Sequence, residues 1–139
     1  MTRIESVLRA VYAGLFFLAG GMKVADPERF AVSIARLRAV PFPLIGPVAI
    51  LIPWVELTAA AALFVPSFRR PALVVLLALL GAATTELLLG LALGATSCGC
   101  FGVESRLEFA IPRNLVLIAV GLYLIRPSAQ SMPRVTSST

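Results

Sequence analysis

The sequence contains no histidine and only two cysteines, and charged residues make up 14% of its 139 residues. A soluble domain of this size carries about 25% charged residues. The shortage of charge excludes the polar exterior of a water-soluble fold, and the lack of histidine leaves too few ligands for a closed zinc site within one chain. Apolar residues are abundant instead, at 59% of the chain, and the mean hydropathy is +0.95. The sequence therefore predicts an integral membrane domain with no metal site.

The basic residues give a net charge of +5 but are scattered along the chain. Their longest run is Arg69-Arg70, and no aromatic residues alternate with them as a base-stacking surface would require. Basic residues that border apolar segments are typical of membrane-orientation signals. We expect the partner of this surface to be the lipid bilayer, with no nucleic-acid partner.

Four apolar segments predict an all-α fold, a bundle of four transmembrane helices. They cover approximately Ile4–Ala25, Phe42–Phe68, Pro71–Ala95 and Pro112–Ile125. The charge-free stretches of the first and fourth segments give only about 20 Å and 18 Å of helix, less than a hydrocarbon core of about 30 Å. Lys23, Arg113 and Asn114 must therefore lie within the membrane envelope, either snorkelling or facing the bundle interior.

The segment between the first two spans predicts an amphipathic helix. Asp26 is a suitable N-cap residue, and Pro27 suits the first helical position. Phe30, Ile34 and Leu37 then recur at helical spacing. We expect this helix to lie in the membrane interface.

The motif Cys98-Gly99-Cys100 carries the sharpest chemical signal. A disulfide that encloses a single glycine is strained, and strained disulfides are easily reduced. A basic neighbour, whether Lys23, Arg106 or Arg113, would favour the reactive thiolate. The alternatives are two small hydrophobic residues or an inert staple, although a staple over so short a loop removes little chain entropy. Redox chemistry is the preferred interpretation.

Glu56 and Glu86 are the only charged residues within the second and third apolar segments. A carboxylate at membrane depth costs at least about 2.5 kcal/mol on insertion scales and marks a candidate functional site. In antiparallel helices both acids lie about 18 Å from the same membrane face. They could share a proton, form a relay, or hydrogen-bond to neighbouring helices through residues such as Thr84.

An even number of spans places both termini on one side of the membrane. Basic residues are equal in number on the two sides, so the positive-inside rule decides little. Arg69-Arg70 in a short loop, and the oxidising compartment that a disulfide pair needs, favour cytoplasmic termini and an extracytoplasmic Cys98/Cys100 loop. Residues 1–127 form the predicted membrane domain, and the Ser/Pro/Thr-rich residues 128–139 form a predicted disordered tail.

Several short motifs occur in the order and spacing of one family. They are Gly21-Met22-Lys23 with Pro27 and Phe30, then Pro53-Trp54-Val55-Glu56, Cys98-Gly99-Cys100-Phe101-Gly102, and Arg113-Asn114. Together they resemble the MauE/DoxX family of redox-associated membrane proteins. The resemblance covers the chain from the first span to the fourth, and the cysteine motif is its most specific part.

The resemblance implies a four-helix bundle in the bacterial cytoplasmic membrane. MauE-like members are associated with disulfide formation in exported proteins, notably the small subunit of methylamine dehydrogenase, and DoxX-like members with quinone-linked sulfur oxidation. The resemblance makes Cys98 and Cys100 the catalytic redox pair, with Lys23, Glu56, Arg113 and Asn114 as supporting polar residues.

The expected activity is therefore that of a membrane thiol–disulfide oxidoreductase or redox relay. Electrons would pass to a quinone or to a thioredoxin-like partner, with no covalently bound cofactor. Quinone-coupled enzymes that form disulfides use two cysteine pairs, whereas this chain has one, so a separate protein could supply the second. The alternative is a small non-enzymatic subunit that stabilises a larger respiratory or redox complex, with a structural Cys98–Cys100 loop.

Overall fold

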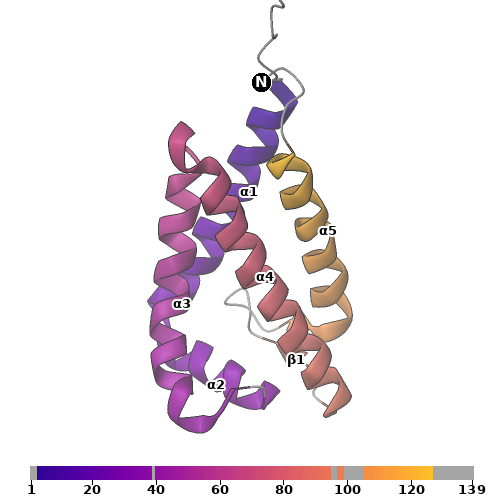
Figure 1. The fold of residues 1–139 in the computed structure, drawn as a ribbon. Coiled ribbons are helices and arrows are strands. Elements are labelled where there is room, and N and C mark those ends of the chain that lie inside the picture. Colours follow the sequence, from indigo (N-terminus) through magenta and orange to yellow (C-terminus); the bar gives the residue numbers. More distant parts are fainter. Residues whose placement is uncertain (1–2, 39, 95–96, 99–104, 127–139) are drawn as a thin grey trace, which may run out of the picture.

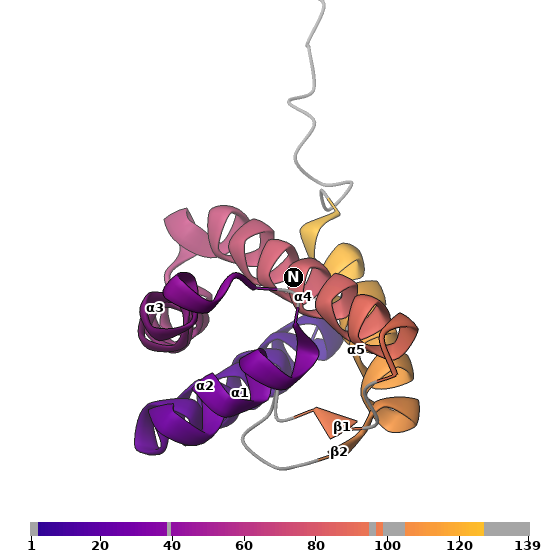
Figure 2. The same cartoon turned by 90° about the horizontal axis from the view of Figure 1, so that it is seen from below.

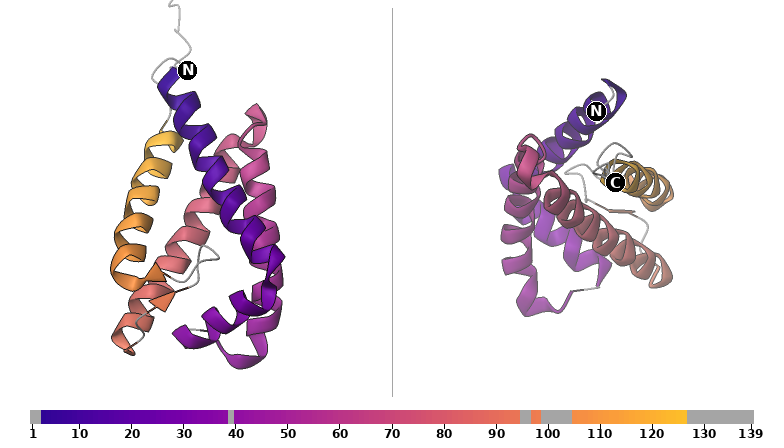
Figure 3. Two further views of the ribbon diagram at one scale, coloured as in Figure 1. Left: turned by 180° about the vertical axis from the view of Figure 1, so that it is seen from behind. Right: turned by 45° about the horizontal axis from the view of Figure 1, so that its top comes forward.

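The computed structural model describes residues 3–38, 40–94, 97–98 and 105–126. The elements are α1 (Arg3–Ala25), α2 (Pro27–Leu37), α3 (Phe42–Ala62), the 3₁₀ helix η1 (Pro66–Phe68), α4 (Arg69–Ala92), β1 (Ser97–Cys98), β2 (Ser105–Arg106) and α5 (Leu107–Ile125). The long helices α1, α3, α4 and α5 form a bundle, and the start of α1 lies at the same end of it as the last turn of α5 (Figures 1 and 3). The predicted all-helical bundle is therefore present, while the number of membrane crossings stays a prediction.

Length and composition support the membrane assignment. In the described part of the chain, three segments are long and apolar enough to cross a bilayer, and a shorter apolar helix completes the bundle. The three are Arg3–Ala25, Phe42–Ala62 and Pro66–Ala92, and the shorter helix is Phe109–Ile125. The chain is a multi-pass membrane protein whose outer surface contacts the lipid bilayer.

Two predicted boundaries were wrong. The second span ends at Ala62 and not at Phe68, because Pro66 disfavours the helical conformation in the preceding residue, and Val65 is extended. The fourth span begins at Leu107 and includes Pro112. Its 19 residues give about 28 Å of helix, so α5 is longer than its charge-free stretch suggested.

The core of the bundle lies between α1, α3, α4 and α5. Tyr12 and Phe16 project from α1 with their ring centroids 5.0 Å apart. They belong to one cluster with Leu63, at the end of α3, and with Leu76 of α4, both fully buried. Hydrophobic burial has little driving force between helices that are surrounded by lipid, so this contact depends on close packing.

Two glycines allow the helices to approach closely. A Cβ atom added at Gly121 of α5 would lie 2.6 Å from Leu77 Cδ2 and 2.8 Å from the Tyr12 hydroxyl oxygen. A Cβ atom at Gly20 of α1 would lie 3.2 Å from the Pro53 carbonyl oxygen of α3. Small residues at helix crossings are typical of membrane bundles.

The predicted helix between the first two spans is present as α2. The Asp26 carboxylate accepts a hydrogen bond from the Arg29 backbone N–H at 3.0 Å, and Pro27 occupies the first turn, as predicted. Phe30 and Ile34 are buried in a cluster with Ala49 of α3. The apolar side of α2 therefore packs on the protein, where α2 crosses the end of the bundle and contacts α1, α3 and α4 (Figure 2).

The strands add a small feature that the all-α prediction did not contain. β1 and β2 pair antiparallel, with Cys98 opposite Ser105 and Ser97 opposite Arg106. Both strands contact α5. They lie at the end of the bundle that α2 crosses, away from the start of α1 (Figure 1).

Candidate functional site

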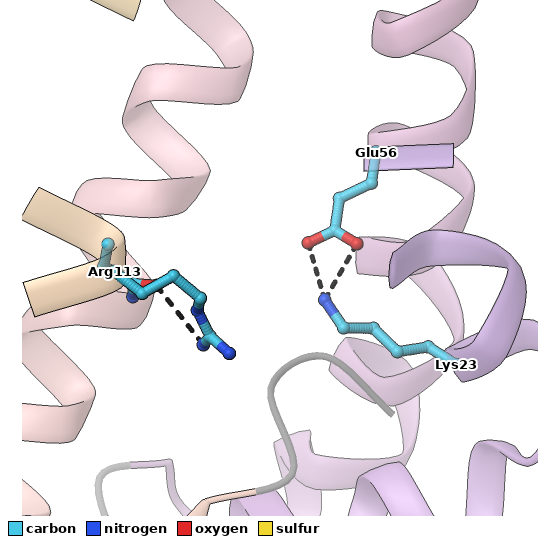
Figure 4. A network of polar contacts seen from close by, with 4 residues as sticks. Lys23, Glu56 and Arg113 are labelled. Carbon is cyan, nitrogen blue, oxygen red and sulfur yellow. Dashed lines mark hydrogen bonds and ion pairs between the residues drawn. The ribbon is translucent and has the colours of Figure 1, made fainter. Parts of the chain in front are cut away.

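Lys23 and Glu56 form an ion pair inside the bundle. Lys23 lies in the last turn of α1, and Glu56 lies in α3. The Lys23 Nζ donates to Glu56 Oε1 at 2.7 Å and to Oε2 at 2.8 Å, as Figure 4 shows. The two residues are only 5% and 6% exposed. Lys23 therefore faces the bundle interior, which decides between the two positions that the sequence left open.

The arrangement satisfies both charges where water is scarce. An unpaired charge at this depth would cost several kcal/mol, whereas paired charges offset part of each other's desolvation. The sequence placed Glu56 near threonines or near Glu86. Its partner is instead Lys23, while the Thr58 hydroxyl donates to the carbonyl of Trp54 in its own helix.

Phe30 covers the ion pair from α2. The Lys23 Nζ lies 5.0 Å from the centroid of the Phe30 ring. A cation at this distance from an aromatic face is attracted by the ring quadrupole. The helical spacing of Phe30 with Ile34 and Leu37 predicted only an apolar face and not this contact. The sequence signal for this contact is the spacing of three residues: Lys23 lies in the last turn of α1, Asp26 caps α2, and Phe30 follows one helical turn after the cap.

A second polar contact joins α4 to α5. Asn114 is 1% exposed, and its Nδ2 donates to Thr84 Oγ1 at 3.3 Å. The Thr84 hydroxyl donates in turn to the Leu80 carbonyl at 2.7 Å. Arg113 Nη2 lies 3.4 Å from Asn114 Oδ1, and its side chain extends from α5 toward the side of the bundle that holds Lys23 and Glu56 (Figure 4). Asn114 thus faces the interior, and Arg113 is half-buried beside it.

Two small cavities flank the ion pair. One, of about 50 Å³, is lined by Lys23, Glu56, Glu86 and residues of α2, α3 and α4, among them Ser33. The other, of about 20 Å³, lies between the ion pair and Asn114. The expected proximity of Glu56 and Glu86 is confirmed, since both line the larger cavity. Among the described residues, Glu86 has no ion-pair partner.

The larger cavity is suited to water and not to a large ligand. A water molecule needs about 10–15 Å³ measured in this way, so the cavity has room for a few, beside carboxylate, ammonium and hydroxyl groups that could bind them. Pockets for organic ligands measure about 300–1,000 Å³. The two cavities beside the ion pair are therefore smaller than the usual pockets for organic ligands.

The cysteine motif is only partly described. Cys98 ends β1, and the ladder holds its backbone opposite Ser105. Cys100 lies outside the described residues. The ladder contacts α5, the helix that carries Arg113 and Asn114. The motif therefore begins at the end of the bundle that contains the polar contacts.

Comparison with known proteins identifies the family. The family model described as methylamine utilisation protein MauE matches residues 1–127. The chain belongs to the MauE family. This range contains Cys98, Cys100 and every polar residue of the candidate site, so the MauE resemblance of the short motifs is confirmed.

Two curated relatives carry the printed name methylamine utilization protein MauE. The chain is 31% identical over 126 residues to the protein of Methylophilus methylotrophus, a match that covers 83% of this chain and 66% of that protein. It is 34% identical over 124 residues to the protein of Paracoccus versutus, covering 86% and 67%. The chain therefore spans about two thirds of the length of these relatives. No solved structure matches this MauE-family chain.

Proposed function

We propose that this MauE-family chain is a membrane thiol–disulfide oxidoreductase or redox relay that uses Cys98 and Cys100 and acts on exported proteins. The observation that carries the proposal is the position of the cysteine motif. It begins in a ladder that contacts α5, the helix that carries Arg113 and the buried Asn114.

The proposed exchange transfers two electrons and two protons from the partner's two thiols to the Cys98–Cys100 disulfide. A thiolate of the exported partner attacks one sulfur of the Cys98–Cys100 disulfide, and the other cysteine leaves as a thiolate. The partner's second thiolate then attacks the mixed disulfide. The partner gains a disulfide, and Cys98 and Cys100 end as thiols. A thioredoxin-like protein with an oxidised pair returns them to the disulfide by the reverse exchange.

Arg113 is the better candidate for favouring a thiolate. Arg113 lies on α5, the helix that contacts the ladder of the cysteine motif. A guanidinium keeps its charge at any pH relevant to exchange. Lys23, Glu56 and Asn114 would then position this end of the bundle, and Glu86 with its cavity could pass protons.

A quinone is the other acceptor that the family resemblance implies. The cavity beside Glu86 is smaller than the usual pockets for organic ligands, so we derive no step through a quinone. The relatives' printed names support a role in methylamine utilisation, and we infer from the family resemblance that the partner is an exported protein. We place the chain in the bacterial cytoplasmic membrane, with its termini cytoplasmic, the Cys98/Cys100 loop extracytoplasmic and α2 at the interface.

Trapping of the partner tests the proposal. In membranes that contain the thioredoxin-like protein with its pair oxidised, the Cys98 thiolate of Cys100→Ala should attack that disulfide and, with no Cys100 to resolve the bond, accumulate a mixed disulfide, seen as a band shift that a reductant removes. Ser105→Ala is the matched control, because it changes the residue opposite Cys98 without removing a sulfur. Reversible oxidation of the pair in a thiol/disulfide buffer is also expected. A pair that does not titrate reversibly would overturn the assignment.

The second candidate function is a non-enzymatic subunit of a larger redox complex. The observation that favours it is the single cysteine pair of the sequence. Cys98→Ser separates the two functions. Lost activity with an intact complex favours the oxidoreductase, whereas retained activity favours the structural subunit. Labelling of Cys98 by a membrane-impermeant maleimide in intact cells, after mild reduction, tests the orientation.

A further inference from the structure

The end of the bundle opposite the ion pair contains a larger and more polar cavity. It measures about 260 Å³ and lies where the start of α1, the turn η1 with the start of α4, and the last turn of α5 converge. Its charged lining residues are Glu5, Arg9, Arg69, Arg70 and Arg126. Four guanidinium groups thus share a hollow with a single carboxylate.

An orientation signal does not require this convergence. Arginines that only anchor helix ends in the headgroups can point in any direction outward. Here residues far apart in the sequence line one cavity, and Arg9 lies within electrostatic reach of both Arg69 and Glu5. Like charges held together are stabilised by an anion that bridges them. A planar guanidinium group can donate two parallel hydrogen bonds to two oxygens of one phosphate.

The position in the bilayer indicates the source of the phosphate. The cavity lies at the ends of three membrane helices, where lipid headgroups are found. Tyr123, which also lines it, is 46% exposed, as is typical of tyrosines at the headgroup level. Leu73 and Leu124 add an apolar edge, along which acyl chains can continue.

We propose that this cavity binds the phosphate headgroup of an anionic phospholipid. Arg70 and Arg126 are exposed and approach from α4 and from the end of α5, so they provide separate contacts to the lipid. Arg9 and Arg69, half-buried, form the floor. The proposal does not depend on the cysteine chemistry at the other end.

The test uses the full chain in mild detergent. Short-chain phosphatidylglycerol is titrated against Arg70→Gln/Arg126→Gln and against Arg29→Gln/Arg36→Gln, an equally charged control pair on α2. Lipid adducts are counted by native mass spectrometry, with phosphatidylcholine as the zwitterionic probe and glycerol phosphate as the soluble one. Near a membrane surface each arginine contributes about 1 kcal/mol, so the cavity pair should weaken phosphatidylglycerol binding roughly 30-fold.

The outcomes are distinct. Weaker binding confined to the cavity pair, with little binding of phosphatidylcholine or glycerol phosphate, supports the proposal. Equal weakening by the control pair would mean that only net charge matters, and would overturn it. Binding of glycerol phosphate as tight as that of phosphatidylglycerol would identify a soluble phosphate ester as the ligand and overturn the lipid assignment.

Discussion

Replacing Glu56 by glutamine should destabilise the bundle more than any other conservative change at the site. The variant keeps the shape of the side chain but leaves the Lys23 ammonium buried opposite a neutral amide. Breaking a buried ion pair in this way costs about 3–5 kcal/mol. One amide oxygen can still accept from Lys23 Nζ, and Phe30 remains 5.0 Å away, so we expect a loss near the lower limit, about 3 kcal/mol.

Removing the cation of the ion pair gives a second test of the same interaction. Lys23→Met should cost a similar amount, because it leaves the carboxylate buried without its cation. The double variant Lys23→Met/Glu56→Gln removes both charges and should recover most of the loss, since uncharged replacements of a buried pair are often neutral. With single losses of about 3 kcal/mol each and a double variant that loses about 1 kcal/mol or less, the coupling energy of the cycle should reach about 5 kcal/mol, above the usual range of about 0.5–3 kcal/mol for residues in contact.

Unfolding in mixed micelles of increasing SDS fraction, followed by circular dichroism, measures each free energy of unfolding. Glu86→Gln is the matched control, because it removes a carboxylate from the same cavity where no ion pair is described. If Glu56→Gln cost no more than Glu86→Gln, or if the two single losses simply added, the ion pair would not stabilise the bundle and the argument would be refuted.

Three further predictions address other parts of the molecule. Gly121→Ala should lower the free energy of unfolding by about 1–3 kcal/mol through overpacking. Gly14→Ala should be neutral or stabilising, because a Cβ atom there meets nothing within 4 Å. Unfolding in the same mixed micelles measures both variants, and a neutral Gly121→Ala would contradict the close approach of the helices. Glu86→Gln should change that free energy by less than about 1 kcal/mol, since a neutral side chain loses no ion-pair energy there, and a loss like that of Glu56→Gln would indicate a missed partner. Arg113→Gln should slow alkylation of Cys98 near neutral pH by reducing its thiolate fraction, measured in a correctly inserted protein, and an unchanged pH profile would exclude Arg113 as its electrostatic partner.

Much of the fold follows from composition and spacing. Long apolar segments set the helices, and the Asp26-Pro27 pair starts α2 because a capping carboxylate and a proline both suit a first helical turn. The boundaries near Pro66 and Pro112 were less predictable. One proline ended a helix and the other lies inside one, because a membrane helix tolerates proline where neighbouring helices satisfy the freed backbone groups.

The residues of the candidate site could be predicted from the sequence, but which of them contact one another could not. The short charge-free stretches predicted that Lys23 and Asn114 could face the bundle interior, where both are buried, and Glu56 and Glu86, predicted at equal depth, line one cavity. Which charges meet depends on how α1 packs against α3. That contact is set by Gly20, whose missing side chain lets the helices approach, and sequence spacing along separate helices contains no such information.

The ion pair and the neighbouring polar contacts connect the helices of the candidate site. Lys23 and Glu56 join the end of α1 to the middle of α3, and Phe30 ties α2 to the same cation. Asn114 and Thr84 join α4 to α5, the helix that contacts the ladder of the cysteine motif. A change at the ion pair would therefore act on the proposed chemistry through the position of the helices, while a change at Arg113 would act through charge. Activity lost in Glu56→Gln should return in the double variant with Lys23→Met, and activity lost in Arg113→Gln should not return with any repacking of the bundle.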